Sequence, residues 1–210
     1  EYEQTASLAT LLALQMLQVS TDGECEEKVK ELLPIEKSHD YFITTNDYQL
    51  LKYILTLYTN SIIFHPTLKN QLATEGDLNR LNELMQDENA DIQQRAVWCI
   101  WNMLRFGELE IISNILSFED LPVNLVDLSF VMEDISFVKS VLVPSIITVS
   151  KKIRAESLDE QDPFKSFLES LIEPLKDLCY KEGAPEIMCL AASCLKNVFP
   201  DQFNAESFPN

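Results

Sequence analysis

Two histidines, His39 and His65, are the natural candidates for acid–base catalysis or metal binding. His65 precedes a proline in an expected turn between helices. His39 lies between Ser38 and Asp40 in a polar stretch that we expect to be a loop. Neither histidine has a Cys or Glu at metal-ligand spacing, and no nucleophile motif accompanies either. Four glycines are too few for a glycine-rich phosphate loop. We therefore predict a protein that is not an enzyme, with no catalytic residue, no cofactor and no bound metal.

The cysteines are the other reactive side chains. They are Cys25, Cys99, Cys179, Cys189 and Cys194. Their number is odd, no two of them form a CxxC pair, and four of the five lie in apolar, helix-like runs. This pattern is typical of buried thiols in a reducing compartment, so we expect a cytoplasmic or nuclear location.

The charge balance restricts the class of partner. The chain has 34 acidic and 16 basic side chains among 210 residues, for a formal net charge of −18. Such a field repels a phosphate backbone, so we do not expect nucleic-acid binding, whereas a basic protein partner would suit it. Acidic clusters such as residues 24–27 and 159–162 are interpreted as solvated faces or linkers. No apolar run reaches the roughly 18 residues that a membrane span needs.

Nearly the whole chain has the pattern of short helices, and we find no convincing strand. The scarcity of glycine argues against an all-β sandwich, which needs many tight turns. Asn46 or Asp47, Asp77 and Asp134 stand where helix N-caps are expected. The predicted helices cover residues 5–19, 25–33, 47–60, 66–76, 78–85, 90–106, 108–116, 122–132, 134–153, 163–180 and 185–199.

An internal period of 42 residues relates two of these helices. Four apolar positions and a terminal asparagine recur: Leu50, Ile54, Leu55, Tyr58 and Asn60 correspond to Ile92, Ala96, Val97, Ile100 and Asn102. Related patterns occupy residues 5–18, 134–150 and 185–198, with Gln18, Ser145 and Asn197 at the polar position. A period of this length, with about three helices per unit, is typical of an α-solenoid, in which the last helices of successive units line a concave surface.

Residues 92–103, with the sequence IQQRAVWCIWNM, resemble the third helix of an armadillo repeat, whose pattern is V-x-x-x-A-A-W-A-L-x-N-L. The unit before adds His65-Pro66 and Gly76 at the family spacing, and residues 187–198 fit the pattern again. The likeness is strongest over residues 47–103 and weakest over 104–162. It implies a right-handed superhelix of four to five units over residues 1–199. The expected third helices lie near 5–18, 47–60, 90–104, 134–150 and 185–198, and a frayed tail is expected at 200–210.

The resemblance also implies a binding site. Armadillo proteins bind an extended peptide in the groove lined by their third helices, where asparagines contact the main chain of the ligand. A carboxamide suits this role because it offers a donor and an acceptor together. By resemblance, Asn60, Asn102 and Asn197 make such contacts. Gln18 and Ser145 hold the matching positions with a longer amide and a short hydroxyl.

A tryptophan completes the implied groove. Trp98 stands four residues before Asn102, where importin-α-type adaptors pack a tryptophan against the stem of a ligand lysine. Packing in the solenoid core is the alternative for Trp98. For Trp101, offset by about 300° around the helix, a core or flanking position is expected. An unliganded Asn102 is expected to face water, so that its removal weakens binding without affecting stability.

We interpret the chain as a non-enzymatic scaffold or adaptor that binds an extended and possibly basic segment of a protein partner. Three alternatives remain open. They are an importin-α-type adaptor for basic cargo, a purely structural solenoid, and a scaffold resembling the armadillo subunit of GID/CTLH ubiquitin-ligase complexes. The irregular stretch 104–162 is expected to be a modified repeat that binds a second subunit. The chain begins at Glu1 and opens directly into an apolar helix, so we expect a fragment from which repeats have been removed.

Overall fold

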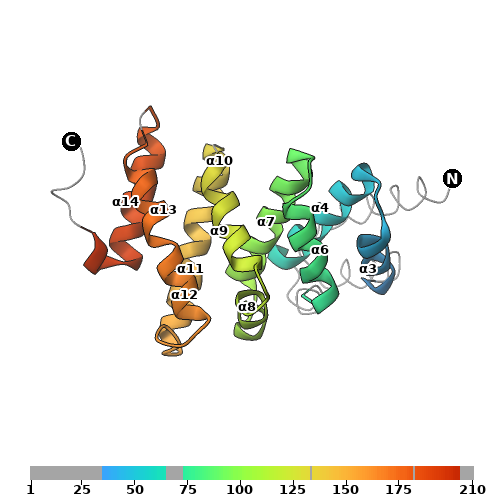
Figure 1. Cartoon of the computed structure of the whole chain (residues 1–210), viewed down its shortest axis with the longest axis horizontal. Helices are drawn as coiled ribbons and strands as arrows, with labels where there is room; N and C mark the ends of the chain where they lie inside the picture. Colours follow the sequence, from blue (N-terminus) through green and yellow to red (C-terminus); the bar gives the residue numbers. More distant parts are fainter. Residues whose placement is uncertain (1–34, 65–72, 133, 182, 204–210) are drawn as a thin grey trace. The chain divides into compact units, whose positions relative to one another are not determined.

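The computed structural model describes residues 35–64, 73–132, 134–181 and 183–203. The all-α prediction is confirmed, since the described residues form helices joined by short turns, with no strand among them (Figure 1). The predicted helix 5–18, with Gln18, lies outside them. The chain divides into two compact units, residues 1–111 and 112–210. The first unit contains α3 (Ile35–Thr44), α4 (Tyr48–Phe64), α6 (Glu75–Met85) and α7 (Ala90–Phe106), and α8 (Leu109–Leu116) crosses the boundary.

Two 17-residue helices, α4 and α7, pack against each other at the centre of the first unit. Asp47 caps α4, because its carboxylate accepts hydrogen bonds from the backbone N–H groups of Gln49 and Leu50 at 2.8 and 3.1 Å. Asn89 caps α7 in the same way, and α7 ends at Gly107, as predicted. All eight apolar positions of the 42-residue period are at most 1% exposed: Leu50, Ile54, Leu55, Tyr58, Ile92, Ala96, Val97 and Ile100. The repeated pattern is therefore a pattern of core positions, at which each large aliphatic side chain contributes on the order of 1.5–3 kcal/mol by its burial.

The start of α6 corrects the predicted cap. Asp77 was expected at the N-cap, but the helix begins at Glu75 and Thr74 is the N-cap. The hydroxyl of Thr74 accepts from the Asp77 backbone N–H, and the Asp77 carboxylate accepts from the Thr74 backbone N–H at 3.2 Å. This reciprocal capping box satisfies two backbone donors at once, which a cap at Asp77 alone would not do.

The predicted loop around His39 is wrong, because residues 35–44 form α3. Polar residues dominate this stretch, and its packing against α4 and α6 favours the helix. Phe42 is fully buried and lies against the Tyr58 ring, with 5.1 Å between ring centroids and an interplanar angle of 54°. The imidazole Nδ1 of His39 lies 2.7 Å from the buried carboxylate of Asp77, so α3 also supplies the polar partner of that group.

The second unit contains α9 (Leu121–Val131), α10 (Ile135–Phe137), η1 (Val138–Leu142), α11 (Val143–Ala155), α12 (Phe164–Ser170), α13 (Ile172–Cys179), α14 (Pro185–Val198) and η2 (Pro200–Gln202). Asp134 caps α10, and the helix continues to Ala155 with one π-helical turn at η1. Pro144 accounts for that turn, because it lacks a backbone N–H and its ring crowds the carbonyl four residues earlier. Pro174 acts similarly on the predicted helix 163–180, which is divided at Leu171 into α12 and α13.

Candidate functional site

A pocket between α4 and α7 brings together two of the predicted site residues, Asn60 and Trp98. Its volume is about 160 Å³. It is lined by Leu55, Thr56, Thr59 and Asn60 from α4 and by Arg95 and Trp98 from α7. Residues from the ends of two sequence repeats thus meet at one hollow, because the helices that carry them pack side by side within the first unit (Figure 1).

The amide of Asn60 is the main polar feature of this pocket. Its Nδ2 is shielded from solvent and has no hydrogen-bond partner among the residues that the structure describes. A buried donor without a partner costs about 1–3 kcal/mol, so a ligand acceptor that reached it would relieve this cost. Trp98, three residues beyond Arg95 on α7, is half-buried and presents part of its ring to the same pocket.

The rim of the pocket is unusually cationic for an acidic chain. Arg95 donates from Nε to the Asp91 carboxylate and from Nη1 to the Thr56 hydroxyl, both at 2.9 Å. Lys52 forms an ion pair with the same carboxylate. The Lys52 ammonium, aided by the Arg95 guanidinium, holds the pKa of the Asp91 carboxyl below its usual range. Two cations therefore share one carboxylate next to the pocket. Sequence reasoning missed this arrangement because Arg95 and Thr56 are 39 residues apart.

The structure corrects the expectation that Asn102 faces water. Only 3% of its surface is exposed. Its Nδ2 donates to the backbone carbonyl of Trp98 at 2.9 Å, one turn earlier on α7. The side chain is therefore a buried part of the helix rather than a solvated group at an open groove. The expected Trp101 core position is confirmed, since that ring is fully buried.

The corresponding residues of the second unit differ from each other. Asn197 is exposed on α14 and donates to the carbonyl of Ser193 at 2.8 Å, which repeats the Asn102 geometry on another helix. Ser145 on α11 is fully buried, and its hydroxyl makes no hydrogen bond to a described residue. Ser145 is thus enclosed, whereas Asn197 is open to solvent.

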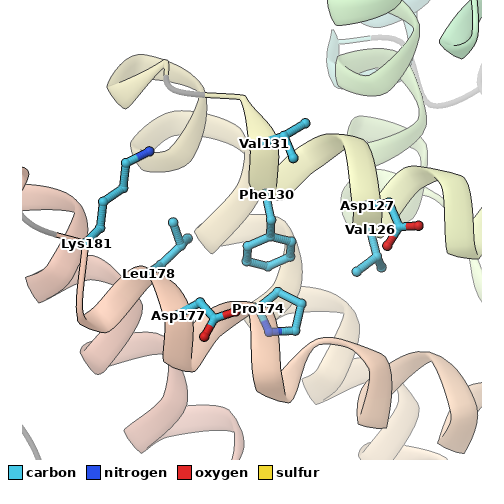
Figure 2. Close-up of a pocket in the computed structure, with 8 residues that line it drawn as sticks. All are labelled: Val126, Asp127, Phe130, Val131, Pro174, Asp177, Leu178 and Lys181. Atoms are coloured by element: carbon cyan, nitrogen blue, oxygen red, sulfur yellow. The ribbon is translucent and has the colours of Figure 1, made fainter.

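A larger hollow of about 370 Å³ lies between α9 and α13 in the second unit. Figure 2 shows the Phe130 ring reaching from α9 toward Pro174 on α13, with the carboxylates of Asp127 and Asp177 at the edges. Val131, at its upper rim, is 70% exposed. Sequence analysis placed the α9 side of this hollow in the irregular stretch 104–162 and the α13 side in the predicted helix 163–180, and it did not identify the hollow. Its lining lacks a recurring motif, and no sequence signal would have joined α9 to α13.

The described thiols are free and mostly inert. Cys99, Cys179 and Cys194 are buried and Cys189 is exposed. Burial raises the pKa of the Cys99 and Cys194 thiols to about 12 and that of Cys179 to about 11. Within the described ranges, no group of three or more His, Cys, Asp or Glu side chains is placed to hold a metal ion. In the same ranges no helix is both long and apolar enough to span a membrane.

Comparison with known proteins gives a fold and no family. No protein-family model matches the chain, and no curated protein matches its sequence. A crystal structure of an engineered protein, from the Northeast Structural Genomics Consortium, is similar over 94% of this chain and 93% of that one. The TM-score is 0.61 at 13% sequence identity, a level at which the likeness concerns the fold alone.

Proposed function

We propose that this chain is a non-catalytic, armadillo-type protein-interaction module that binds an extended segment of a partner at the α4–α7 pocket. One observation carries the proposal: Asn60 and Trp98, which occupy motif positions on two helices related by the 42-residue period, line the same pocket. The all-α fold and the buried apolar positions of both repeats support this interpretation.

The chemistry of the pocket suits a peptide backbone. An extended segment has unpaired N–H and C=O groups, and a carboxamide can pair with either. The Nδ2 of Asn60 makes no hydrogen bond to a described residue, whereas the Nδ2 of Asn102 is already engaged with Trp98. We therefore assign main-chain recognition to Asn60 and a helix-stabilising role to Asn102. The exposed face of Trp98 would pack against a ligand side chain and contribute on the order of 1 kcal/mol.

Peptide selection followed by backbone methylation tests this function. Random twelve-residue peptides are displayed and selected against the whole chain, and their affinities are measured by fluorescence anisotropy. Asn60→Ala should weaken binding by about 5- to 150-fold, which corresponds to about 1–3 kcal/mol. Asn114→Ala, which removes an exposed amide from α8, is the matched control and should leave the affinity unchanged.

Main-chain recognition has its own signature. N-methylation of one peptide bond in the selected ligand should abolish binding, while many side-chain replacements at that position should be tolerated. If the selected peptides bind Asn60→Ala and Trp98→Ala as tightly as the unaltered chain, the pocket is not the binding site. A structural solenoid, whose contacts lie elsewhere, would then be the better hypothesis.

A further inference from the structure

The polar side chains that line the α4–α7 pocket include one cation, Arg95, and no carboxylate among the described residues. The four polar lining residues are Thr56, Thr59, Asn60 and Arg95. A guanidinium has five N–H donors, and the Arg95 contacts described above use only Nε and Nη1. Donors therefore remain on Arg95, beside the free amide N–H of Asn60. Such a set matches an anionic oxygen rather than a cation.

The charges on the two helices strengthen this match. Lys52 is the only charged residue of α4, and α7 carries Asp91, Arg95 and Arg105. At the pocket rim, Lys52 and Arg95 face a single carboxylate, that of Asp91, which leaves a local excess of one positive charge. The side chains of the three are 30%, 39% and 40% exposed, so a ligand can reach this cluster.

The net charge of −18 is summed over the whole chain, whereas a bound ligand responds most to nearby charges. At physiological ionic strength the Debye length is about 8 Å, so exposed charges farther away than this are largely screened. Among the described residues, Arg95 lines the pocket and is linked directly to Asp91, which also pairs with Lys52. A lysine packed on Trp98 would lie within one helical turn of Arg95 and would meet a like charge. A glutamate there would pack its aliphatic stem on the ring and receive charge-assisted hydrogen bonds from the guanidinium.

We propose that the α4–α7 pocket binds an acidic partner segment, with a ligand Asp or Glu carboxylate on Arg95 and the adjoining ligand main chain on Asn60. The proposal rests on the proposed function of the same pocket and specifies its ligand. It departs from the basic partner that the overall charge suggests.

Three matched peptides test the charge preference. Each is a fluorescein-labelled twelve-residue peptide of alternating Val and Thr in which three central residues are Glu, Gln or Lys. Binding to the whole chain is measured by fluorescence anisotropy at 150 mM and 500 mM NaCl. The Glu peptide should bind most tightly and the Lys peptide least, and the higher salt should weaken the Glu peptide most.

Two variants with opposite effects test the role of the cluster. Arg95→Gln should weaken the Glu peptide about tenfold or more, to the level of the Gln peptide. Asp91→Asn removes the carboxylate that competes for Arg95 and Lys52, and should strengthen the Glu peptide several-fold. A variant that merely unfolded the chain could not increase affinity. Arg105→Gln, on the same helix but outside the pocket lining, is the control. It should leave the affinities for the Glu peptide and the Gln peptide unchanged.

The outcomes separate this inference from the function on which it rests. If the Lys peptide binds most tightly and Asn60→Ala abolishes that binding, the pocket is a peptide site but the acidic preference is refuted. If Arg95→Gln leaves the Glu peptide unaffected, the carboxylate contact is refuted. If Asn60→Ala and Trp98→Ala change no peptide's affinity, including that of display-selected peptides, the proposed function fails as well.

Discussion

Two tryptophans three residues apart on α7 should respond in opposite ways to truncation. Trp101 is fully buried, whereas Trp98 lines the pocket and is only half-buried. A buried tryptophan removes about 150–250 Å² from water, and its replacement by alanine also leaves a cavity. Trp101→Ala should therefore lower the free energy of unfolding by about 3–5 kcal/mol. Trp98→Ala should lose about half as much, because part of its ring is already in water.

Thermal and urea unfolding measure the difference. For a chain of this size, 1 kcal/mol corresponds to a shift of about 2–4 °C in Tm, so Trp101→Ala should lower Tm by about 6–20 °C. The chain has two tryptophans, so Trp101→Phe leaves Trp98 as the sole indole emitter. Acrylamide should quench this emission, and a bound peptide should protect it. Trp98→Phe leaves the buried Trp101, whose emission should be neither quenched nor affected by peptide.

Equal destabilisation by the two alanine substitutions would refute the reasoning. It would mean that Trp98 is a core residue and that the pocket does not expose its ring. The same conclusion would follow if acrylamide failed to quench Trp98 in the Trp101→Phe variant. The peptide-binding proposal would then lose its only aromatic contact and depend on Asn60 alone.

The remaining predictions concern an amide, a thiol and a glycine. Asn102→Ala should lower the free energy of unfolding by about 1 kcal/mol in urea melts, since it removes a buried hydrogen bond. Asn197→Ala, at an exposed site, should change that free energy by no more than about 0.5 kcal/mol. Iodoacetamide at pH 8 should alkylate exposed Cys189 well before Cys99, as mapped by mass spectrometry, and equal rates would contradict the burial that raises the pKa of the Cys99 thiol to about 12. The unfolded thiol ionises near pH 8.5, so the neutral Cys99 thiol contributes fully to the free energy of unfolding below that pH. This contribution should be lost as the pH rises from about 9 to about 12. Cys99→Ala should remove this part of the pH dependence of stability. Gly107→Ala should cost about 1–3 kcal/mol, because a Cβ there would lie 2.4 Å from the carbonyl oxygen four residues earlier, so an unchanged Tm would be unexpected.

The sequence predicted those parts of the fold that local chemistry determines. The caps at Asp47 and Asp134 and the end of α7 before Gly107 follow from groups within a few residues along the chain, and the structure has them as expected. The apolar positions of the 42-residue period are core positions because a regular helix repeats its buried face. At such positions the local sequence is enough to predict where a helix ends and which of its faces is buried.

The errors arose where a distant contact overrides local preference. Residues 35–44 look like a polar loop, and they form α3 because Phe42 packs on Tyr58. The pairing of His39 with Asp77 spans 38 residues and has no local signature. Asn102 and Asn60 hold equivalent motif positions, but the amide nitrogen of Asn102 is engaged with its own helix while that of Asn60 is free. A sequence motif can identify a position but not the surroundings that decide its role.

The expected charge of the ligand also depends on whether the whole sequence or the surroundings of the pocket are considered. Net charge sums every side chain with equal weight, and on that measure a basic partner is favoured. Binding energy depends on charges within a few ångströms of the ligand, where Arg95 and Lys52 outnumber Asp91. Long-range attraction by the acidic surface would raise the association rate of a basic peptide, while the local cluster would raise the dissociation rate of a lysine placed on Trp98. A kinetic measurement separates the two effects, because a basic peptide should associate quickly, dissociate quickly and lose its association advantage at high salt. An acidic peptide should associate slowly and remain bound, and Arg95→Gln should act on its dissociation rate. If Arg95→Gln changed only the association rate, Arg95 would steer ligands from outside the pocket and would not hold them within it.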